Sequence, residues 1–243
     1  MPVAMVRLSD ADETYFFQKF SSSSSGSLKS KLQQMFLKAR GFGEGPCLML
    51  IGLEGDKETV IWAQAQTEAI AKAEGAMALG TGPGRKWYEG RFHSPYSRDP
   101  MLDRGLGVDT LETSTRWSNI VALREKVTTA ISKAMDENVP EQGARGIVMA
   151  HVSHSYPDGA SLYFTFVFPR QRDREVEQWE TIKRAASDAI EAGGGTISHH
   201  HGVGTDHQPW MLEEKGEIGI GTLKAVKQKL DPKGILNPGK LLG

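Results

Sequence analysis

Two runs rich in β-branched and aromatic residues, 147–153 and 161–168, lie on either side of the turn sequence Tyr-Pro-Asp-Gly at residues 156–159. Proline and glycine preset the backbone of such a turn, and Asp-Gly favours a tight reversal. The pattern therefore predicts two antiparallel strands in a hairpin or near-hairpin. A helix is predicted next, over residues 172–192, and it ends at three consecutive glycines, 193–195.

Apolar runs of strand length and helical stripes with a period near 3.6 continue along the rest of the chain. The remaining predicted strands span residues 3–8, 46–53, 75–79, 108–114 and 196–198, and the remaining predicted helices begin after residue 8 or span 55–72, 117–138 and 216–230. Strands followed by helices thus occur twice, with the hairpin in the second half. This order predicts an α+β fold, with a ferredoxin-like antiparallel sheet, helices on one face and a C-terminal helical segment.

Three further segments are predicted to be turns or loops. The serine run at 21–25 is expected to be a polar turn. Residues 80–84, Gly-Thr-Gly-Pro-Gly, look at first like a phosphate-binding loop, but the Lys-Ser/Thr pair of a Walker loop is missing and Pro83 interrupts the glycines. A plain turn is therefore expected there. Residues 87–103 combine cations and aromatics with few long apolar residues, which favours an extended or irregular stretch.

Composition excludes several classes of protein. The chain has 29 lysines and arginines against 30 aspartates and glutamates, so no broad basic field is available to hold nucleic acid. Cys47 is the only cysteine and lies in an apolar run, so it is expected to be buried and to form no internal disulfide. No transmembrane stretch or signal peptide is recognisable, and a reducing cytoplasm is the predicted location.

Three consecutive histidines, His199, His200 and His201, stand between glycine-rich stretches at 193–195 and 202–204. Imidazoles are costly to bury unpaired, and glycines let a backbone approach a ligand closely. Histidine is also the side chain that transfers protons near neutral pH. The segment is therefore predicted to be a catalytic loop, with a polar surface loop and a satisfied core cluster as the alternatives.

A metal site is the sharper rival interpretation of these histidines. His199, His201 and His207, together with His151 and His154, offer enough nitrogen ligands for a metal ion. However, adjacent histidines in an extended chain point to opposite faces, and no cysteine or properly placed carboxylate accompanies them. The sequence therefore predicts no metal site.

Two segments of the sequence resemble those of a known family. The segments Gly-Gly-Thr-Ile-Ser-His-His-His-Gly-Val-Gly (194–204) and Asp-Pro-Lys-Gly-Ile-Leu-Asn-Pro-Gly-Lys (231–240) resemble the C-terminal domain of FAD-linked oxidases of the vanillyl-alcohol oxidase superfamily. His-His-His-Gly is similar to the alkyldihydroxyacetonephosphate synthase branch, whereas branches related to glycolate oxidase and D-lactate dehydrogenase show Gly-Glu-His-Gly there. Residues 111–117 and 153–166 look like the same branch, so the resemblance covers essentially the whole chain.

The resemblance implies an FAD cofactor that is held mainly by a separate N-terminal domain, over which this chain forms a cap. Residues 1–198 would then be the cap or substrate domain, and residues 199–243 the His-rich catalytic loop with a C-terminal helical segment that docks toward the flavin domain. The implied partners are an N-terminal FAD-binding domain or subunit and a small-molecule or lipid-like substrate. A homo-oligomer is a further expectation, because an unpartnered cap leaves apolar surface exposed.

The implied reaction is a flavin-mediated, net non-redox exchange, in which a long-chain alcohol replaces the acyl group of acyl-dihydroxyacetone phosphate. By resemblance, Tyr163 is the acid/base phenol, and His199, His200 and His201 orient it and move protons. A phenol with a pKa of about 10 needs such neighbours to act at neutral pH. From the residues alone, Tyr163 beside Phe164 reads as an ordinary core aromatic. The alternative functions are an FAD-linked 2-hydroxy-acid oxidase or dehydrogenase and a non-catalytic cap subunit.

The remaining candidate site residues rest on charge and on the family motif. Arg98, in the basic segment, is the candidate for the phosphate of the substrate, because a guanidinium binds such anions bidentately. Asn237, Lys240 and Gly202 are the candidates for contacts with the flavin or its dinucleotide tail. Asn237 and Lys240 fit equally well as caps of the last turn. Because the phosphate-binding motifs of the flavin domain are missing, the chain is expected to follow a preceding segment and to be inactive alone.

Overall fold

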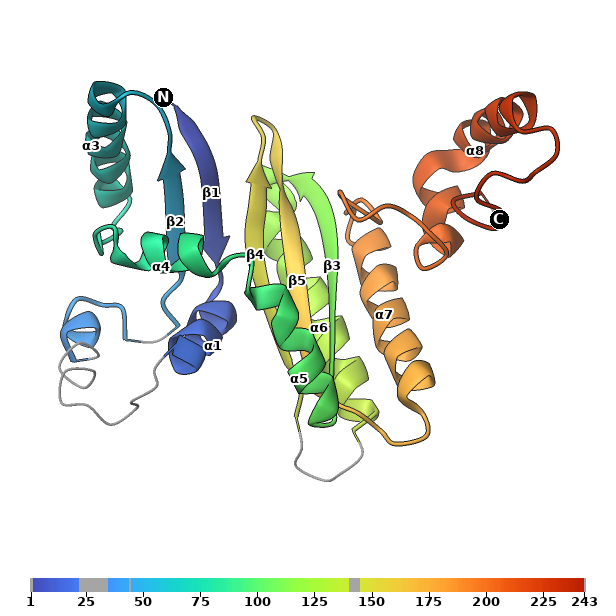
Figure 1. Cartoon of the computed structure of the whole chain (residues 1–243), viewed down its shortest axis with the longest axis horizontal. Coiled ribbons are helices and arrows are strands. Elements are labelled where there is room, and N and C mark those ends of the chain that lie inside the picture. The colour runs from blue at the N-terminus through green and yellow to red at the C-terminus, as the bar shows by residue number, and fades with distance from the viewer. Residues whose placement is uncertain (1, 22–34, 44, 140–144, 243) are drawn as a thin grey trace. The chain divides into compact units, whose positions relative to one another are not determined.

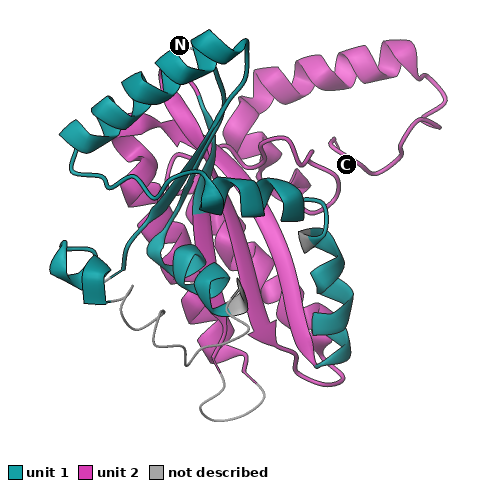
Figure 2. Ribbon diagram, turned by 60° about the vertical axis from the view of Figure 1, so that its left-hand side comes forward, with its two compact units in different colours: residues 1–104, 151–155 teal, residues 105–150, 156–243 magenta. Residues whose placement is uncertain are grey.

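The computed structural model describes residues 2–21, 35–43, 45–139 and 145–242 (Figure 1). The chain divides into two compact units, residues 1–104 with 151–155 and residues 105–150 with 156–243 (Figure 2). Hydrogen bonds link five strands in the order β2-β1-β4-β5-β3. The pairs β1–β2, β1–β4 and β3–β5 are antiparallel, which confirms the predicted α+β class. No helix among the described residues is long and apolar enough to span a membrane.

The first unit is built on β1 (Val3–Ser9) and β2 (Leu48–Leu53), which pair antiparallel. The last residues of β1 also pair with the end of β4 (Ile147–Ser155), where Leu8 faces Val152. Two predicted helices are confirmed as α1 (Ala11–Ser21) and α3 (Lys57–Ala73). The predicted turn at 21–25 lies, beyond residue 21, outside the described residues.

Residues 75–103 differ from the sequence-based prediction. No strand forms over 76–80, and the turn predicted at 80–84 is instead the start of a helix, α4 (Gly82–Gly90). Pro83 lies in the first turn of α4, where no backbone N–H is needed, so proline there begins a helix rather than interrupting a loop. The rest of the segment is also helical rather than extended, with a 3₁₀ turn (Ser94–Ser97) followed by α5 (Arg98–Asp103). The prediction for Cys47 was also wrong, because it precedes β2 and is exposed.

The second unit centres on β3 (Leu106–Arg116) and β5 (Gly159–Pro169), which pair antiparallel along their whole length. Two long helices, α6 (Ile120–Glu137) and α7 (Glu175–Glu191), pack against each other and against β3. The core between them is apolar and almost fully buried, and its largest apolar members are Leu111, Leu123, Ile131, Met135, Phe164, Phe166, Ile182 and Ile190. α8 (Met211–Leu230) follows the His-rich loop, and Gly216 interrupts it with a φ of 67°.

The pairing of β3 with β5 decides which side chains share a face. Leu111 and Thr113 are buried toward α6 and α7, so the alternate residues Glu112, Ser114 and Arg116 lie on the opposite face. In the register, Glu112 lies opposite Tyr163, and residues directly opposite each other project to the same side. A row of polar side chains therefore runs along the face of β3 and β5 that is turned away from the helices.

Candidate active site

The His-rich loop follows β3 closely from Gly195 onward, and a larger residue at Gly195 would require neighbouring atoms to move. A Cβ at Gly195 would lie 2.5 Å from Thr113 Oγ1 and 2.8 Å from Leu123 Cδ2. Beyond this contact, the backbone N–H of Thr196 donates to Ser114 O (3.0 Å) and that of His199 donates to Glu112 O (3.0 Å). Residues 196–198 are therefore not the predicted regular strand, but they follow β3 closely enough to place His199 beside Glu112.

The carboxylate of Glu112 lies at the centre of the histidine cluster. Its side chain is 3% exposed, and its Oε1 is 3.2 Å from His199 Nδ1. Its second oxygen, Oε2, is 3.7 Å from His201 Nε2. A buried carboxylate beside an imidazole N–H fixes the tautomer and orientation of the ring. The sequence-based statement that no carboxylate accompanies the histidines is thus wrong.

The backbone of the triplet turns sharply at His200. The N–H of His201 donates to His199 O (2.8 Å), and His200 between them has a φ of 60°. This is a γ-turn with a conformation that residues other than glycine rarely adopt, and such strain concentrates at functional sites. The turn stacks the His200 ring on that of His199, with centroids 4.0 Å apart, while His199 and His201 approach the same carboxylate.

Two tyrosines approach the cluster from the hairpin strands and their turn. The ring of Tyr163, on β5, meets that of His201 edge-on, with centroids 5.3 Å apart. The hydroxyl of Tyr156, just after β4, is 3.1 Å from His199 Nε2. Tyr156, His199 and Glu112 thus form a continuous phenol–imidazole–carboxylate chain. The structure therefore brings the four predicted catalytic residues into one cluster.

Glu112 and Tyr156 are the members that the sequence reasoning missed. One signal was available for Glu112, since a glutamate interrupts an otherwise apolar and hydroxyl-bearing run in a predicted strand. Buried carboxylates are rare unless they are paired, so a charge at that position indicates a partner. No comparable signal indicates a role for Tyr156, because it belongs to a sequence that is typical of a turn.

The three predicted cofactor contacts belong to the same unit. The N–H of Leu241 donates to Gly204 O (3.1 Å), which ties the C-terminal segment to the end of the His-rich loop. Asn237 and Lys240 are exposed in that segment, and Gly202 has a φ of 77° with open space around its Cα. Their role as caps is taken by Asp231, whose carboxylate accepts from the N–H groups of residues 235 and 236.

Arg98 and two histidines of the metal hypothesis, His151 and His154, belong to the first unit. Arg98 is exposed at the start of α5. His151 is buried, and its Nδ1 lies 2.9 Å from Glu13 Oε1, while Arg7 reaches the same oxygen at 2.9 Å. Burial raises the pKa of Glu13, but hydrogen bonding and charge from His151, with Arg7, outweigh it and the pKa is lowered. His151 therefore belongs to an internal group with Glu13 and Arg7.

His207, also named in the metal hypothesis, is buried in the second unit. Its side chain is covered, and its Nδ1 has no hydrogen-bond partner among the described residues. Burial, and then the charge of Lys183, lowers the pKa of His207 below its ordinary value of 6.5. The nearby charges of Asp206 and Asp109 act in the opposite direction, but the net effect is a lowered pKa for His207, which favours the neutral ring.

Comparison with known proteins identifies the family. Residues 1–241 match the model of the family described as FAD linked oxidases, C-terminal domain. The chain is 33% identical to the alkyldihydroxyacetonephosphate synthases of Dictyostelium discoideum, over 98% of this chain and 39% of that protein, and of Trypanosoma brucei brucei, over 80% and 31%. A solved structure of an alkyldihydroxyacetonephosphate synthase superposes with a TM-score of 0.70 at 29% identity, covering 96% of this chain and 39% of that one.

The chain thus spans less than half the length of the relatives that it matches. The match nevertheless covers almost all of this chain, including the hairpin and the His-rich loop. The sequence-based resemblance is therefore confirmed. The chain belongs to the family of FAD-linked oxidase C-terminal domains.

Proposed function

We propose that this chain supplies the acid–base groups of an FAD-dependent enzyme, which exchanges the acyl group of acyl-dihydroxyacetone phosphate for a long-chain alcohol. The observation that carries the proposal is the cluster around Glu112, in which two imidazoles approach one buried carboxylate and a tyrosine contacts each imidazole. Two relatives that are 33% identical to this chain over the aligned residues are alkyldihydroxyacetonephosphate synthases.

The residues at the C-terminal end fit an FAD cofactor. Lys240 offers a cation and Asn237 an amide donor, both exposed, and the pyrophosphate of a dinucleotide needs such groups. At Gly202 no atom lies within 4 Å of an added Cβ, so the backbone there is open to a close approach. When bound, FAD supplies an electron-accepting ring that activates the substrate carbon. An N-terminal FAD-binding domain or subunit is the partner that would hold the rest of the cofactor.

The chain's own residues would then handle the protons. Tyr163 is the proposed acid/base at the substrate carbon, and the edge of the His201 ring beside it provides a polar neighbour for the phenol. Glu112 lies beside His201 and His199 and orients both rings, so either imidazole is placed to exchange a proton with the neighbouring phenol. His200, stacked on His199, limits the motion of that ring.

Further parts of the proposal rest on the sequence and on the family. Arg98 is proposed as a contact to the phosphate of the substrate, by charge alone. A cytoplasmic location and a homo-oligomer are likewise proposed from the sequence. The rival activity toward 2-hydroxy acids has no particular support in the geometry of the cluster.

The test uses the chain together with its FAD-binding domain and compares Tyr163→Phe with Tyr15→Phe, an exposed tyrosine of the first unit. We expect Tyr163→Phe to keep its fold and flavin content while kcat falls by about 10²–10⁴. Tyr15→Phe should change nothing. Near-normal turnover of Tyr163→Phe would remove the phenol from the mechanism. Turnover of 2-hydroxy acids without any alkyl exchange would replace the proposed reaction by the oxidase one, and no turnover at all would favour a non-catalytic cap.

A further inference from the structure

Tyr156 contacts the histidine cluster but has no assigned part in the proposed reaction. Its hydroxyl lies 3.1 Å from His199 Nε2, the ring nitrogen that does not face Glu112. We propose that Tyr156 is a positioning residue, which holds the imidazole of His199 in place from the side opposite Glu112 and thereby keeps the carboxylate beside His201. The assignment rests on the proposed function, because it concerns the proton steps of that reaction.

The two contacts of His199 decide which group donates in each. An ionised carboxylate can only accept, so the Glu112 oxygen that lies 3.2 Å from Nδ1 requires the ring hydrogen at Nδ1. Nε2 of the neutral ring is then an acceptor, and the hydroxyl of Tyr156 donates to it. Both nitrogens of His199 are therefore engaged, and the ring is held at both ends.

His201 approaches the same carboxylate with its other nitrogen. Its Nε2 lies 3.7 Å from Glu112 Oε2, whereas its Nδ1 makes no hydrogen bond within the described part of the chain. The ring of Tyr163, the proposed acid/base, meets that of His201 edge-on. The two imidazoles are thus not equivalent. His199 is engaged on both sides, while His201 keeps a nitrogen with which it can exchange a proton.

The turn between β4 and β5 holds Tyr156 against the end of β3. The N–H of Tyr156 donates to Gly159 O (2.8 Å), and its carbonyl accepts from the indole Nε1 of Trp117 (2.9 Å). At Gly159 an added Cβ would collide with Thr115 O, so the turn packs directly on the backbone of β3. The strand that carries the carboxylate therefore also anchors the phenol.

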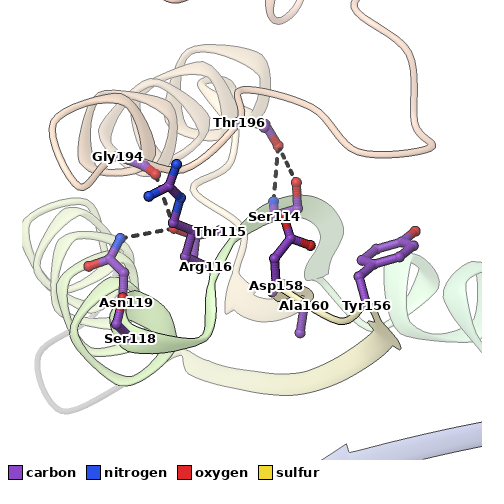
Figure 3. Close-up of a pocket in the computed structure, with 11 residues that line it drawn as sticks. Ser114, Thr115, Arg116, Ser118, Asn119, Tyr156, Asp158, Ala160, Gly194 and Thr196 are labelled. Atoms are coloured by element: carbon purple, nitrogen blue, oxygen red, sulfur yellow. Dashed lines mark hydrogen bonds between the residues drawn. The ribbon is translucent and has the colours of Figure 1, made fainter.

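The loop on the other side of the contact is equally held. The N–H of His199 donates to Glu112 O (3.0 Å). Three residues earlier, the hydroxyl of Thr196 accepts from Ser114 N (3.0 Å) and lies 3.0 Å from Ser114 Oγ. Figure 3 shows this pair together with Tyr156. The phenol and the imidazole thus meet through two segments that are each hydrogen-bonded to the same end of β3.

Solvent limits how much the contact can contribute. Tyr156 lines an open pocket of about 430 Å³ and is 42% exposed, so water competes with His199 for its hydroxyl (Figure 3). An ordinary intramolecular hydrogen bond changes a rate or equilibrium constant by about 2- to 10-fold. A group that itself transfers the proton contributes about 10²–10⁴-fold. The size of the loss therefore distinguishes a positioning residue from a catalytic one.

The kinetic test uses the chain joined to its FAD-binding domain, with replacements that keep a donor toward Glu112. His199→Asn retains an N–H near the place of Nδ1, and His201→Gln retains one near the place of Nε2. We expect kcat to fall about 2- to 10-fold in Tyr156→Phe, with KM nearly unchanged, and about 10²–10⁴-fold in His201→Gln. Tyr15→Phe, at an exposed tyrosine, should behave as wild type.

A double variant tests whether the phenol acts through the imidazole. If it does, Tyr156→Phe combined with His199→Asn should lower kcat no further than His199→Asn alone, because the ring that Tyr156 holds is already missing. Losses that add in full would overturn the positioning role. A wild-type kcat in Tyr156→Phe, or a loss as large as that of His201→Gln, would overturn it as well.

A spectroscopic test does not depend on the reaction. The ¹⁵N signals of the imidazoles are recorded by NMR for the chain alone, well above the ordinary histidine pKa of about 6.5. We expect His199 to carry its hydrogen at Nδ1, and its Nε2 signal to move toward that of a nitrogen without a donor in Tyr156→Phe but not in Tyr15→Phe. This result supports the assignment even in a protein that catalyses no alkyl exchange. A hydrogen at Nε2, or an Nε2 signal that Tyr156→Phe leaves unchanged, refutes the contact and leaves the proposed reaction standing.

Discussion

Replacing Glu112 by glutamine tests whether the carboxylate at the centre of the cluster supports proton transfer. The change keeps the size of the side chain but removes the charge that faces His201 Nε2 at 3.7 Å and His199 Nδ1 at 3.2 Å. At an effective dielectric constant of about 20, a carboxylate stabilises an imidazolium at 3.7 Å by about 4 kcal/mol. A loss of that size in the transition state lowers kcat by about 10³-fold.

The effect on the fold should be much smaller. His199 is held to β3 by its backbone N–H, which donates to the backbone oxygen of Glu112, and glutamine keeps that bond. The amide side chain can still meet one imidazole nitrogen, so we expect a cost of about 1–2 kcal/mol in the free energy of unfolding. The thermal midpoint should fall by only a few degrees.

The assay measures kcat and KM for alkyl exchange from pH 6 to 9, together with flavin content and thermal melting. Glu125→Gln, which alters an exposed glutamate on α6, is the matched control and should behave as wild type. If Glu112→Gln keeps kcat within about threefold of wild type while remaining folded and loaded with FAD, the carboxylate has no part in the proton steps. An equally large loss in Glu125→Gln would show that the assay reports stability instead.

Three further predictions concern stability. Because the pKa of Glu13 is lowered, its contact with His151 stabilises the fold fully above pH 4.5, the ordinary glutamate value, and this stabilisation is lost as the pH falls through the lowered pKa. Glu13→Gln should therefore weaken the dependence of the thermal midpoint on pH in melts recorded from pH 6 to 3. The pKa of His207 is also lowered, so the stabilisation linked to this group is full above pH 6.5 and decreases below it, as the unfolded chain takes up a proton. His207→Phe should therefore remove that part of the pH dependence of the free energy of unfolding, measured by urea denaturation between pH 7 and 5. Gly195→Ala should cost about 1–3 kcal/mol in chemical denaturation, because its Cβ would meet Thr113 Oγ1 at 2.5 Å.

The elements that the sequence predicted correctly are those whose signal is local. The apolar stripe at residues 123, 127 and 131 forms the buried face of α6, and the runs around the Tyr-Pro-Asp-Gly turn form β4 and β5. Burial of one face decides these patterns, so they can be read without knowing the neighbours. The segment 75–103 was misread because its glycines and prolines suggest irregular chain, whereas Pro83 in fact lies where a helix begins.

The candidate site was also recovered only in part. The histidine triplet stands out because three imidazoles between glycines have no simple packing explanation, and Tyr163 followed from the resemblance to a family. A pocket of about 430 Å³ beside Tyr156 could not be predicted from the sequence, since its walls come from a strand end, a helix start, a turn and a loop (Figure 3). Hydroxyl-bearing residues and one arginine in separate segments look like ordinary surface.

The sequence by itself determined the class of fold, the histidine triplet as the candidate site, and the family, because repeated apolar spacing and a contiguous motif are local properties of the chain. Only the tertiary structure decided that Glu112 is the carboxylate between His199 and His201, 87 and 89 positions away, and that Tyr156 rather than Tyr163 donates or accepts at His199. Those contacts depend on the register of β3 with β5 and on the way the loop after α7 follows β3. The register depends on which face of each strand is buried, and it therefore involves many residues of several strands at once. No single segment of the sequence determines it.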